Sequence, residues 1–286
     1  MEGYLDSCDT LDARQFVIAV KRLADSLSYG TDRSPFLGSG VEYVQSRRYE
    51  PGDPIKNIDW RVTARTGKPY VKEYEAPKRM PCYLLIDTSA SMTVSSHTRS
   101  KYATAVHIAG GLAFACLDRV SPVGVIGVGA LNVRVEPSLS KHQILQWLHD
   151  LRRFRYDETT TLGRRVLELS PSLNSRAVII ALSDLHDPEG LPALKQLAAQ
   201  HDVAVLQMRD PAEVHLRGAG FVRAQEAETG AAFVTHGRRS WLDPTFVAEE
   251  LKRSGIDHLV VDTDKPFAIA IRHFFESRSL LGKGAR

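Results

Sequence analysis

Two hydrophobic patterns alternate along the chain from residue 82 onward. Short unbroken apolar runs are typical of strands buried on both faces of a sheet. Segments in which apolar residues return every three or four positions are typical of helices with one buried face. The unbroken runs predict strands at residues 82–87, 122–130, 176–184, 203–208 and 258–263. The periodic segments predict helices at residues 100–120, 142–154, 162–169, 191–200, 244–253 and 266–278.

This alternation of strands and helices implies right-handed crossovers and a mostly parallel sheet. We therefore predict that residues 81–286 form a doubly wound α/β domain, with residues 131–137 as an edge strand and residues 221–236 as a hairpin. In sheets of this kind, ligands bind outside the carboxyl ends of the strands. The loops that follow the strands are therefore the first place to look for a functional site.

Residues 1–80 differ in composition from the rest of the chain. Residues 11–27 carry apolar side chains at helical spacing, which predicts one helix. Residues 31–80 hold ten lysines and arginines against seven aspartates and glutamates, a surplus that equals the whole chain's formal net charge of +3. Because this segment has few long apolar runs, it predicts a small, polar, β-rich module.

Whole-chain composition argues against several classes of protein. The three cysteines form no CxxC pair, which disfavours a disulfide framework and a thiolate zinc site. No stretch approaches the roughly 20 apolar residues of a membrane span, and no signal-peptide pattern is present, so the prediction is a cytoplasmic protein. A net charge of +3 is too small to indicate nucleic-acid binding. Neither a P-loop nor a GxSxG motif occurs.

The sharpest local signal is the sequence DTSAS, which follows the first predicted strand of the α/β domain. Alternate residues of an extended turn point the same way, so Asp87, Ser89 and Ser91 can converge on one point. A carboxylate and two hydroxyls are hard oxygen ligands that suit Mg²⁺ or Mn²⁺. The alternative is a strand followed by serines that cap a helix, which needs no metal.

Two later residues extend this set. Thr160 precedes a short predicted helix, and Asp184 ends the third long apolar strand. Because adjacent parallel strands present their ends together, a Thr160 hydroxyl and the Asp184 carboxylate would complete an oxygen shell. Taken singly, Thr160 also suits a helix cap and Asp184 an ordinary loop position.

An Asp-x-Ser-x-Ser run, a later threonine and an aspartate after an apolar strand together resemble a metal-ion-dependent adhesion site of the von Willebrand factor A fold. The resemblance implies that Ser89, Ser91 and Thr160 are hydroxyl ligands of one Mg²⁺ or Mn²⁺ ion. It implies acidic roles, often through water, for Asp87 and Asp184. It also implies an open coordination position for a carboxylate of a partner.

The sequence departs from that family's pattern in two places. The usual Gly-Gly before the threonine is Glu158-Thr159 here, and three consecutive threonines leave the ligand open among Thr159, Thr160 and Thr161. Thr160 is preferred because it gives the family's T-x-x-G spacing. The usual Asp-Gly of the third motif is Asp-Leu here, so the local turn differs.

A second resemblance covers residues 40–75. The blocks GVEY (40–43), RRYEPGD (47–53), IDWR (58–61), ARTG (64–67) and VKEYE (71–75) are similar to the signature of the family called domain of unknown function fifty-eight. Members are typically encoded beside MoxR-type AAA+ ATPases, and some carry membrane helices. The resemblance implies an accessory or adaptor protein and names no reaction.

The same segment concentrates charged and aromatic residues. The sequence suggests an ion-pair network with an aromatic side chain packed beneath it, formed by Arg48, Asp53, Asp59, Arg61, Arg65 and Trp60. One interpretation is that these residues only hold a small sheet together. The other is a docking surface, since Trp and Arg are enriched at interface hot spots.

Together these patterns favour a non-catalytic, metal-dependent interaction module that works with a MoxR-type AAA+ ATPase or its client. The alternative is a Mg²⁺-dependent phosphohydrolase that uses the same pocket, with Asp157, Glu158 and His186 as candidate bases or nucleophiles. A third hypothesis is a degenerate site that binds no metal and serves only as a scaffold. The client and the oligomeric state are left open.

Overall fold

The computed structural model describes most of the chain. The described ranges are residues 2–5, 42–53, 55–75, 80–118, 120–129, 133–155, 158–173, 175–214, 221–225, 232–236 and 244–280. The helix predicted at residues 11–27 lies outside them. Asp157, one of the candidate bases, also lies outside the described residues.

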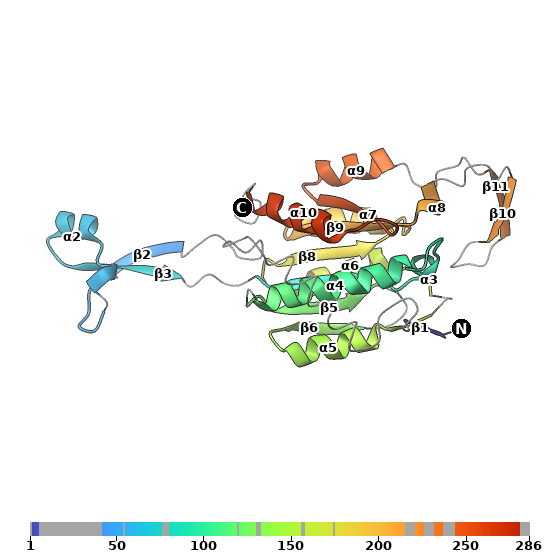
Figure 1. Ribbon diagram of the computed structural model, residues 1–286. Helices are drawn as coiled ribbons and strands as arrows, with labels where there is room; N and C mark the ends of the chain where they lie inside the picture. Colours follow the sequence, from blue (N-terminus) through green and yellow to red (C-terminus); the bar gives the residue numbers. More distant parts are fainter. Residues whose placement is uncertain are drawn as a thin grey trace.

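A six-stranded sheet forms the centre of the molecule (Figure 1). Its strands, in spatial order, are β12 (Asp257–Asp262), β9 (Asp202–Arg209), β8 (Val178–Ser183), β4 (Cys82–Ile86), β5 (Val123–Gly127) and β6 (Arg134–Ser138). The pairings from β12 to β5 are parallel, and only β6 joins antiparallel. The predicted mixed α/β fold with a mostly parallel sheet is confirmed, including the antiparallel edge strand.

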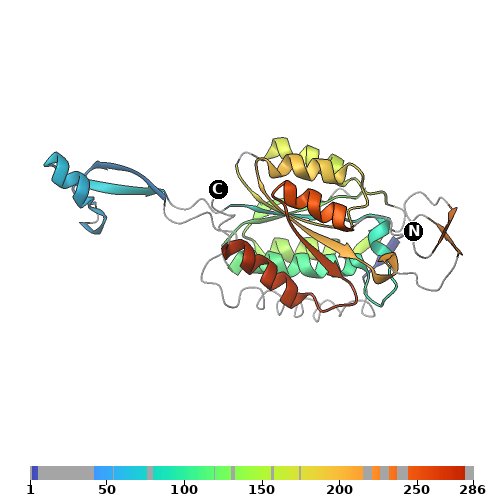
Figure 2. The same cartoon turned by 90° about the horizontal axis from the view of Figure 1, so that it is seen from above.

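Helices cover both faces of this sheet (Figure 2). One face carries α4 (Lys101–Asp118), α5 (Lys141–Asp150) and α10 (Ala268–Leu280). The other carries α6 (Leu162–Leu169), α7 (Gly190–Ala198) and α9 (Pro244–Arg253). Alternate residues of β4 serve the two cores, because Leu84 packs into the first and Leu85 into the second. The continuous apolar run in β4 is therefore explained by two cores rather than one.

Helix α4 is buried on nearly all sides, as expected for a helix that is apolar all round. Its first residue, Lys101, is an exception to that apolar character, because a charged side chain is fully buried there. Short helices follow two strands at the carboxyl edge of the sheet: α3 (Ala90–Thr93) after β4 and α8 (Pro211–Val214) after β9. The sequence pattern predicted neither, because four-residue helices carry too little periodicity.

The N-terminal module contains an antiparallel pair, β2 (Glu42–Arg48) and β3 (Tyr70–Glu75), with η1 (Ile55–Asn57) and α2 (Trp60–Thr66) between them. Asp59 caps α2 by accepting hydrogen bonds from the backbone N–H groups of Arg61 and Val62. Gly67 ends it with φ of 70°, a left-handed conformation that favours glycine. The predicted β-rich module is present, and it also contains helix α2, which the sequence pattern did not predict.

Two further strand pairs complete the described structure. The predicted hairpin is β10 (Phe221–Gln225) paired with β11 (Ala232–His236). The helix predicted at residues 142–154 is too long: it ends at Asp150, and β7 (Arg153–Arg155) pairs with β1 (Glu2–Tyr4) instead. Across the part of the chain that is described, none of the helices combines the length and apolarity needed to cross a membrane.

Candidate functional site

Three aspartates follow three neighbouring strands at the carboxyl edge of the sheet. Asp87 comes after β4, Asp184 after β8 and Asp210 after β9. Because these strands are parallel and adjacent, the aspartates lie along one edge, and all three are buried. Buried carboxylates need hydrogen bonds or cations. The partners of each therefore define what this edge can bind.

Asp87 accepts hydrogen bonds from Ser183, at the end of the adjacent strand β8, and from Ser89. The Ser183 hydroxyl donates to its Oδ2 at 2.5 Å, and the Ser89 backbone N–H donates to its Oδ1 at 3.0 Å. Burial, together with the nearby charge of Asp184, raises the pKa of Asp87 above its ordinary value. Asp87 is thus a buried carboxyl group that two hydrogen bonds hold in one position.

Ser89 and Ser91 converge as the sequence predicts. Their Oγ atoms lie 3.0 Å apart. Ser89 occupies the N-cap position of α3, yet within the described residues its hydroxyl makes no capping bond to that helix. Ser89 thus takes the cap position that the alternative predicts, but its hydroxyl lies against Ser91 and makes no capping bond.

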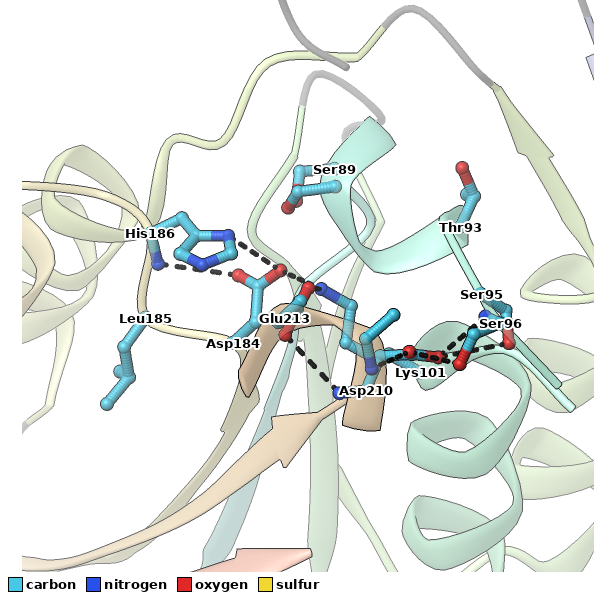
Figure 3. Close-up of polar contacts among 12 residues, drawn as sticks. Ser89, Thr93, Ser95, Ser96, Lys101, Asp184, Leu185, His186, Asp210 and Glu213 are labelled. Atoms are coloured by element: carbon cyan, nitrogen blue, oxygen red, sulfur yellow. Dashed lines mark hydrogen bonds and ion pairs between the residues drawn. The ribbon is translucent and has the colours of Figure 1, made fainter. Parts of the chain in front are cut away.

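Asp184 is surrounded by cationic and N–H donors (Figure 3). Its Oδ2 lies 2.8 Å from Lys101 Nζ and 3.1 Å from His186 Nδ1. The Lys101 ammonium also forms an ion pair with Glu213 of α8. Burial alone would raise the pKa of Asp184, but Lys101 and His186 outweigh burial and hold that pKa below its usual range. Asp184 is therefore a charged group at neutral pH.

The loop before α6 lies beside α3. The Ala90 N–H donates to the Glu158 carbonyl at 2.8 Å, and the Thr88 hydroxyl donates to Glu158 Oε2 at 3.0 Å. Thr161 caps α6 by position, and its hydroxyl lies within hydrogen-bonding distance of the carbonyls of Val128 and Gly129. The Thr161 hydroxyl is therefore engaged with these carbonyls, and the neighbouring Thr160 is half-buried.

Asp210 ties a surface segment to this edge. Ser96 donates to it through both its N–H, at 2.9 Å, and its hydroxyl, at 2.5 Å. The Ala212 N–H adds a third bond at 2.9 Å. Burial opposes the charged form of Asp210, but these donors lower its pKa. The segment between α3 and α4 is therefore anchored where β9 ends.

The residues that sequence reasoning missed are Lys101, Glu213 and Asp210. A usable signal existed for Lys101, since it is the only charged residue before Asp118 in an otherwise apolar helix. Glu213 and Asp210 lie in short polar loops that look like many others in the sequence. Their role depends on the spatial order of β8 and β9, which the chain order alone does not settle.

The predicted ion-pair network of the module is wrong, because its two aspartates bind residues outside the predicted set. Asp53 pairs with Arg47, whose Nη2 lies 2.6 Å from its Oδ1, and this pair lowers the pKa of Asp53. Asp59 is buried, caps α2 and accepts a 2.7 Å bond from the Ser46 hydroxyl, which lowers its pKa. Trp60 is 68% exposed and does not pack beneath the charges.

The other three residues of that set, Arg48, Arg61 and Arg65, are exposed. Together with Trp60 and the equally exposed Ile55, they give the module a basic surface with two large apolar side chains. Helix α2 has no acidic residue in its first turn and Arg65 in its last. Four of the six predicted docking residues are thus solvent-accessible, while Asp59 is structural and Asp53 is paired.

The chemistry of the carboxyl edge suits a cation. Ser89 and Ser91 offer converging hydroxyl oxygens, and Asp184, His186 and Glu213 bring ligand atoms within 4.8 Å of one another. The Lys101 ammonium acts as a stand-in ion, since it lies against Asp184 and Glu213 in the manner of a bound cation. The residues present therefore fit a hard divalent ion by donor type.

Comparison with known proteins identifies relatives but no described activity. Over 284 residues the chain is 27% identical to the uncharacterized protein Rv1480 of Mycobacterium tuberculosis (strain ATCC 25618 / H37Rv) and to the uncharacterized protein Mb1516 of Mycobacterium bovis. Each alignment covers 93% of this chain and 88% of the relative. A crystal structure titled conserved hypothetical protein BatB, from Bacteroides thetaiotaomicron, aligns with a TM-score of 0.46 and 18% identity, covering 70% of this chain and 99% of that one.

A family model described as "Protein of unknown function DUF58" matches residues 45–253, which is well over half of the chain. The match includes both the module of β2, β3 and α2 from residue 45 onward and the carboxyl edge of the sheet. The chain therefore belongs to the DUF58 family.

Proposed function

We propose that this protein is a non-catalytic interaction module whose partner binding depends on one divalent cation, Mg²⁺ or Mn²⁺. The observation that carries the proposal is the pair of hydroxyls of Ser89 and Ser91, 3.0 Å apart at the carboxyl edge of the sheet. Asp87, which accepts from the Ser89 N–H, and Asp184, which follows the neighbouring strand, are buried at the same edge. Ser89, Ser91 and Thr160 would hold the ion as hydroxyl ligands, with Asp87 and Asp184 supplying negative charge.

When bound, the ion would accept a carboxylate from the partner and so bridge the two proteins. Asp87 keeps the Ser89 backbone in place through its bond to the Ser89 N–H. Ser183 in turn orients Asp87. These contacts support a preorganised site, because the groups around the hydroxyls are already fixed by hydrogen bonds.

The partner we propose is a MoxR-type AAA+ ATPase or its client, as the family resemblance implies. The exposed basic and aromatic surface of the module, with Trp60, Arg61 and Arg65, would add a second contact to the same partner. Its charge suits an acidic face with an apolar pocket. Binding would then depend both on the metal bridge at the carboxyl edge of the sheet and on Trp60 of the module.

A phosphohydrolase that uses the same edge is the competing function. His186 favours it, because a half-buried imidazole beside a carboxylate is a common arrangement for a general base. Burial opposes the charged form of His186, but Asp184 outweighs burial and raises its pKa. No recognised catalytic motif accompanies His186 in the sequence, which supports the interaction module over the enzyme.

The test is binding of a MoxR-type ATPase from the same organism, measured with Mg²⁺ and then with EDTA. We expect binding in Mg²⁺, loss in EDTA, and loss in the double variant Ser89→Ala/Ser91→Ala. The matched control is Ser277→Ala, which removes an exposed hydroxyl on α10 that donates to Phe274 O of the same helix. Binding that ignores both EDTA and the double variant would refute the metal bridge. Metal-dependent turnover of a generic phosphoester by the wild type would favour the enzyme.

A further inference from the structure

Lys101 is a fully buried cation at the candidate site, with 0% of its surface exposed. It is the first residue of α4, and it directs its ammonium between Asp184 and Glu213 (Figure 3). Nζ lies 2.8 Å from Asp184 Oδ2 and pairs with Glu213 on the other side. The side chain thus joins the end of β8 to the short helix that follows β9.

The buried ammonium has two anionic partners, Asp184 and Glu213. A buried charge persists only where partners compensate it. The carboxylates and the ammonium are therefore mutually dependent, and one positive charge is permanently attached to this edge of the sheet.

The place that Lys101 occupies has the composition of a cation site. Asp184, His186 and Glu213 each offer one ligand atom, and these atoms lie within 4.8 Å of one another. Asp184 Oδ2 accepts both the Lys101 ammonium and the His186 ring nitrogen. Two carboxylates and an imidazole suit Mn²⁺ better than Mg²⁺, since Mg²⁺ prefers an all-oxygen shell.

We propose that the Lys101 ammonium is a built-in cation that competes with the divalent metal for Asp184, so that Lys101 sets the metal affinity of the site. This inference rests on the metal site of the proposed function. Asp184 cannot give the same oxygen to an ammonium and to a metal ion, and two like charges at neighbouring positions repel. Lys101 therefore keeps the free protein's affinity low, and a partner's carboxylate has to supply the missing negative charge.

Removal of the ammonium is expected to increase metal binding, an effect that structural damage would not produce. The experiment is calorimetric titration of Mn²⁺, and separately Mg²⁺, into wild type and Lys101→Met. We expect Lys101→Met to bind Mn²⁺ at least tenfold more tightly than wild type. Lys101→Arg keeps the positive charge and is expected to retain the low affinity. The matched control is Lys195→Met, which removes a lysine that pairs with Glu250 between α7 and α9.

A second substitution locates the effect. In the Lys101→Met background, Glu213→Gln is expected to remove most of the gain, because Glu213 is the second carboxylate that the ammonium covers. A gain that survives Glu213→Gln unchanged would overturn the competition at this cluster. Should Lys101→Met fail to fold in EDTA, recovery of its native circular dichroism in millimolar Mn²⁺ supports the proposal, and failure to recover contradicts it.

The outcomes separate this inference from the proposed function. If wild type binds metal and Lys101→Met binds no more tightly, the role of Lys101 is refuted and the metal bridge stands. If wild type shows no binding and Lys101→Met binds, the competition by Lys101 is supported, and the EDTA test with the ATPase alone decides the metal bridge. If neither protein binds either ion, the role of Lys101 is refuted.

Discussion

The carboxyl edge of the six-stranded sheet buries its charged groups, whereas the module of β2, β3 and α2 leaves most of its charges in solvent. At the sheet edge, Lys101, Asp87 and Asp184 are inaccessible to solvent. Lys101 donates to Asp184, and the Ser183 hydroxyl donates to Asp87. On the module, the Arg47–Asp53 pair is partly exposed and Trp60 is 68% exposed. Both regions belong to the segment that the family model matches.

This difference matches the two contacts of the proposed function. Fixed buried groups suit a small ion, because their geometry is set before the ion arrives. Exposed arginines and an exposed tryptophan suit a large partner, which excludes water from them only when it binds. Substitution of a buried charged group in the first region should therefore change folding stability, whereas substitution of an exposed charged or aromatic side chain in the second should leave it nearly unchanged.

Lys101→Met should have the largest effect on stability. Removing one member of a buried ion pair leaves an uncompensated charge, which costs about 3–5 kcal/mol. We expect the free energy of unfolding in EDTA to fall by that amount in urea denaturation. Arg47→Met, which breaks the partly exposed pair with Asp53, should leave the urea midpoint almost unchanged. Equal losses in the two variants would contradict the comparison.

Gly129→Ala should come next. A Cβ atom at this position would overlap the Thr88 hydroxyl and approach Glu158 Oε2, two groups that are hydrogen-bonded to each other. Overpacking of this kind costs about 1–3 kcal/mol.

In the module, Gly67 is required because of its backbone conformation, whereas Gly129 is required because of the space around it. Gly67 has nothing within 4 Å of an added Cβ, but its φ of 70° is strained for alanine. Gly67→Ala should cost about 1 kcal/mol and show itself as faster hydrogen exchange in α2 alone. Exchange that also accelerates in the central sheet would show that the two regions unfold together.

Asp87→Asn tests the buried carboxyl. Folding raises the pKa of Asp87, so its contribution to stability is present below the unfolded pKa and is lost as pH rises through the folded one. We expect Asp87→Asn in EDTA to be more stable than wild type at pH 7.5, by on the order of 1 kcal/mol. The difference should shrink toward pH 4. Thermal melts across this pH range measure it, and a difference that grows as pH falls would contradict the sign.

The sequence predicted the sheet and part of the site, because both follow from short-range patterns. Asp87, Ser89 and Ser91 follow a strand whose apolar run is unmistakable. The hydroxyls of Ser89 and Ser91 converge as predicted, although Ser91 lies in α3 and not in an extended turn. Helix α2 was missed although Asp59 and Gly67, a cap residue and a terminating glycine, stand at its ends.

What the sequence did not reveal depends on contacts between distant segments. The helix ending at Asp150 was extended too far because β7 exists only through its pairing with β1, far away in the chain. Glu213 reaches Lys101 across 112 positions, and no local pattern marks either as a partner of the other. A charged residue at the start of a mostly apolar helix is the signal that could have drawn attention to Lys101.

Trp60→Ala should have the smallest effect on stability and a large effect on binding. Its side chain is 68% exposed, so its removal should change the free energy of unfolding by no more than about 0.5 kcal/mol. If α2 is the docking surface, an aromatic anchor there is worth about 2 kcal/mol or more, which is a loss of at least roughly 30-fold in affinity for the ATPase. Phe246→Ala on α9 is the matched control, because Phe246 is 58% exposed and lies on the α/β domain.

A tenfold or greater loss of binding confined to Trp60→Ala would assign recognition of the partner to the module. Equal binding by wild type and both variants would leave the carboxyl edge of the sheet as the sole contact, and the exposed tryptophan would then have no part in this interaction.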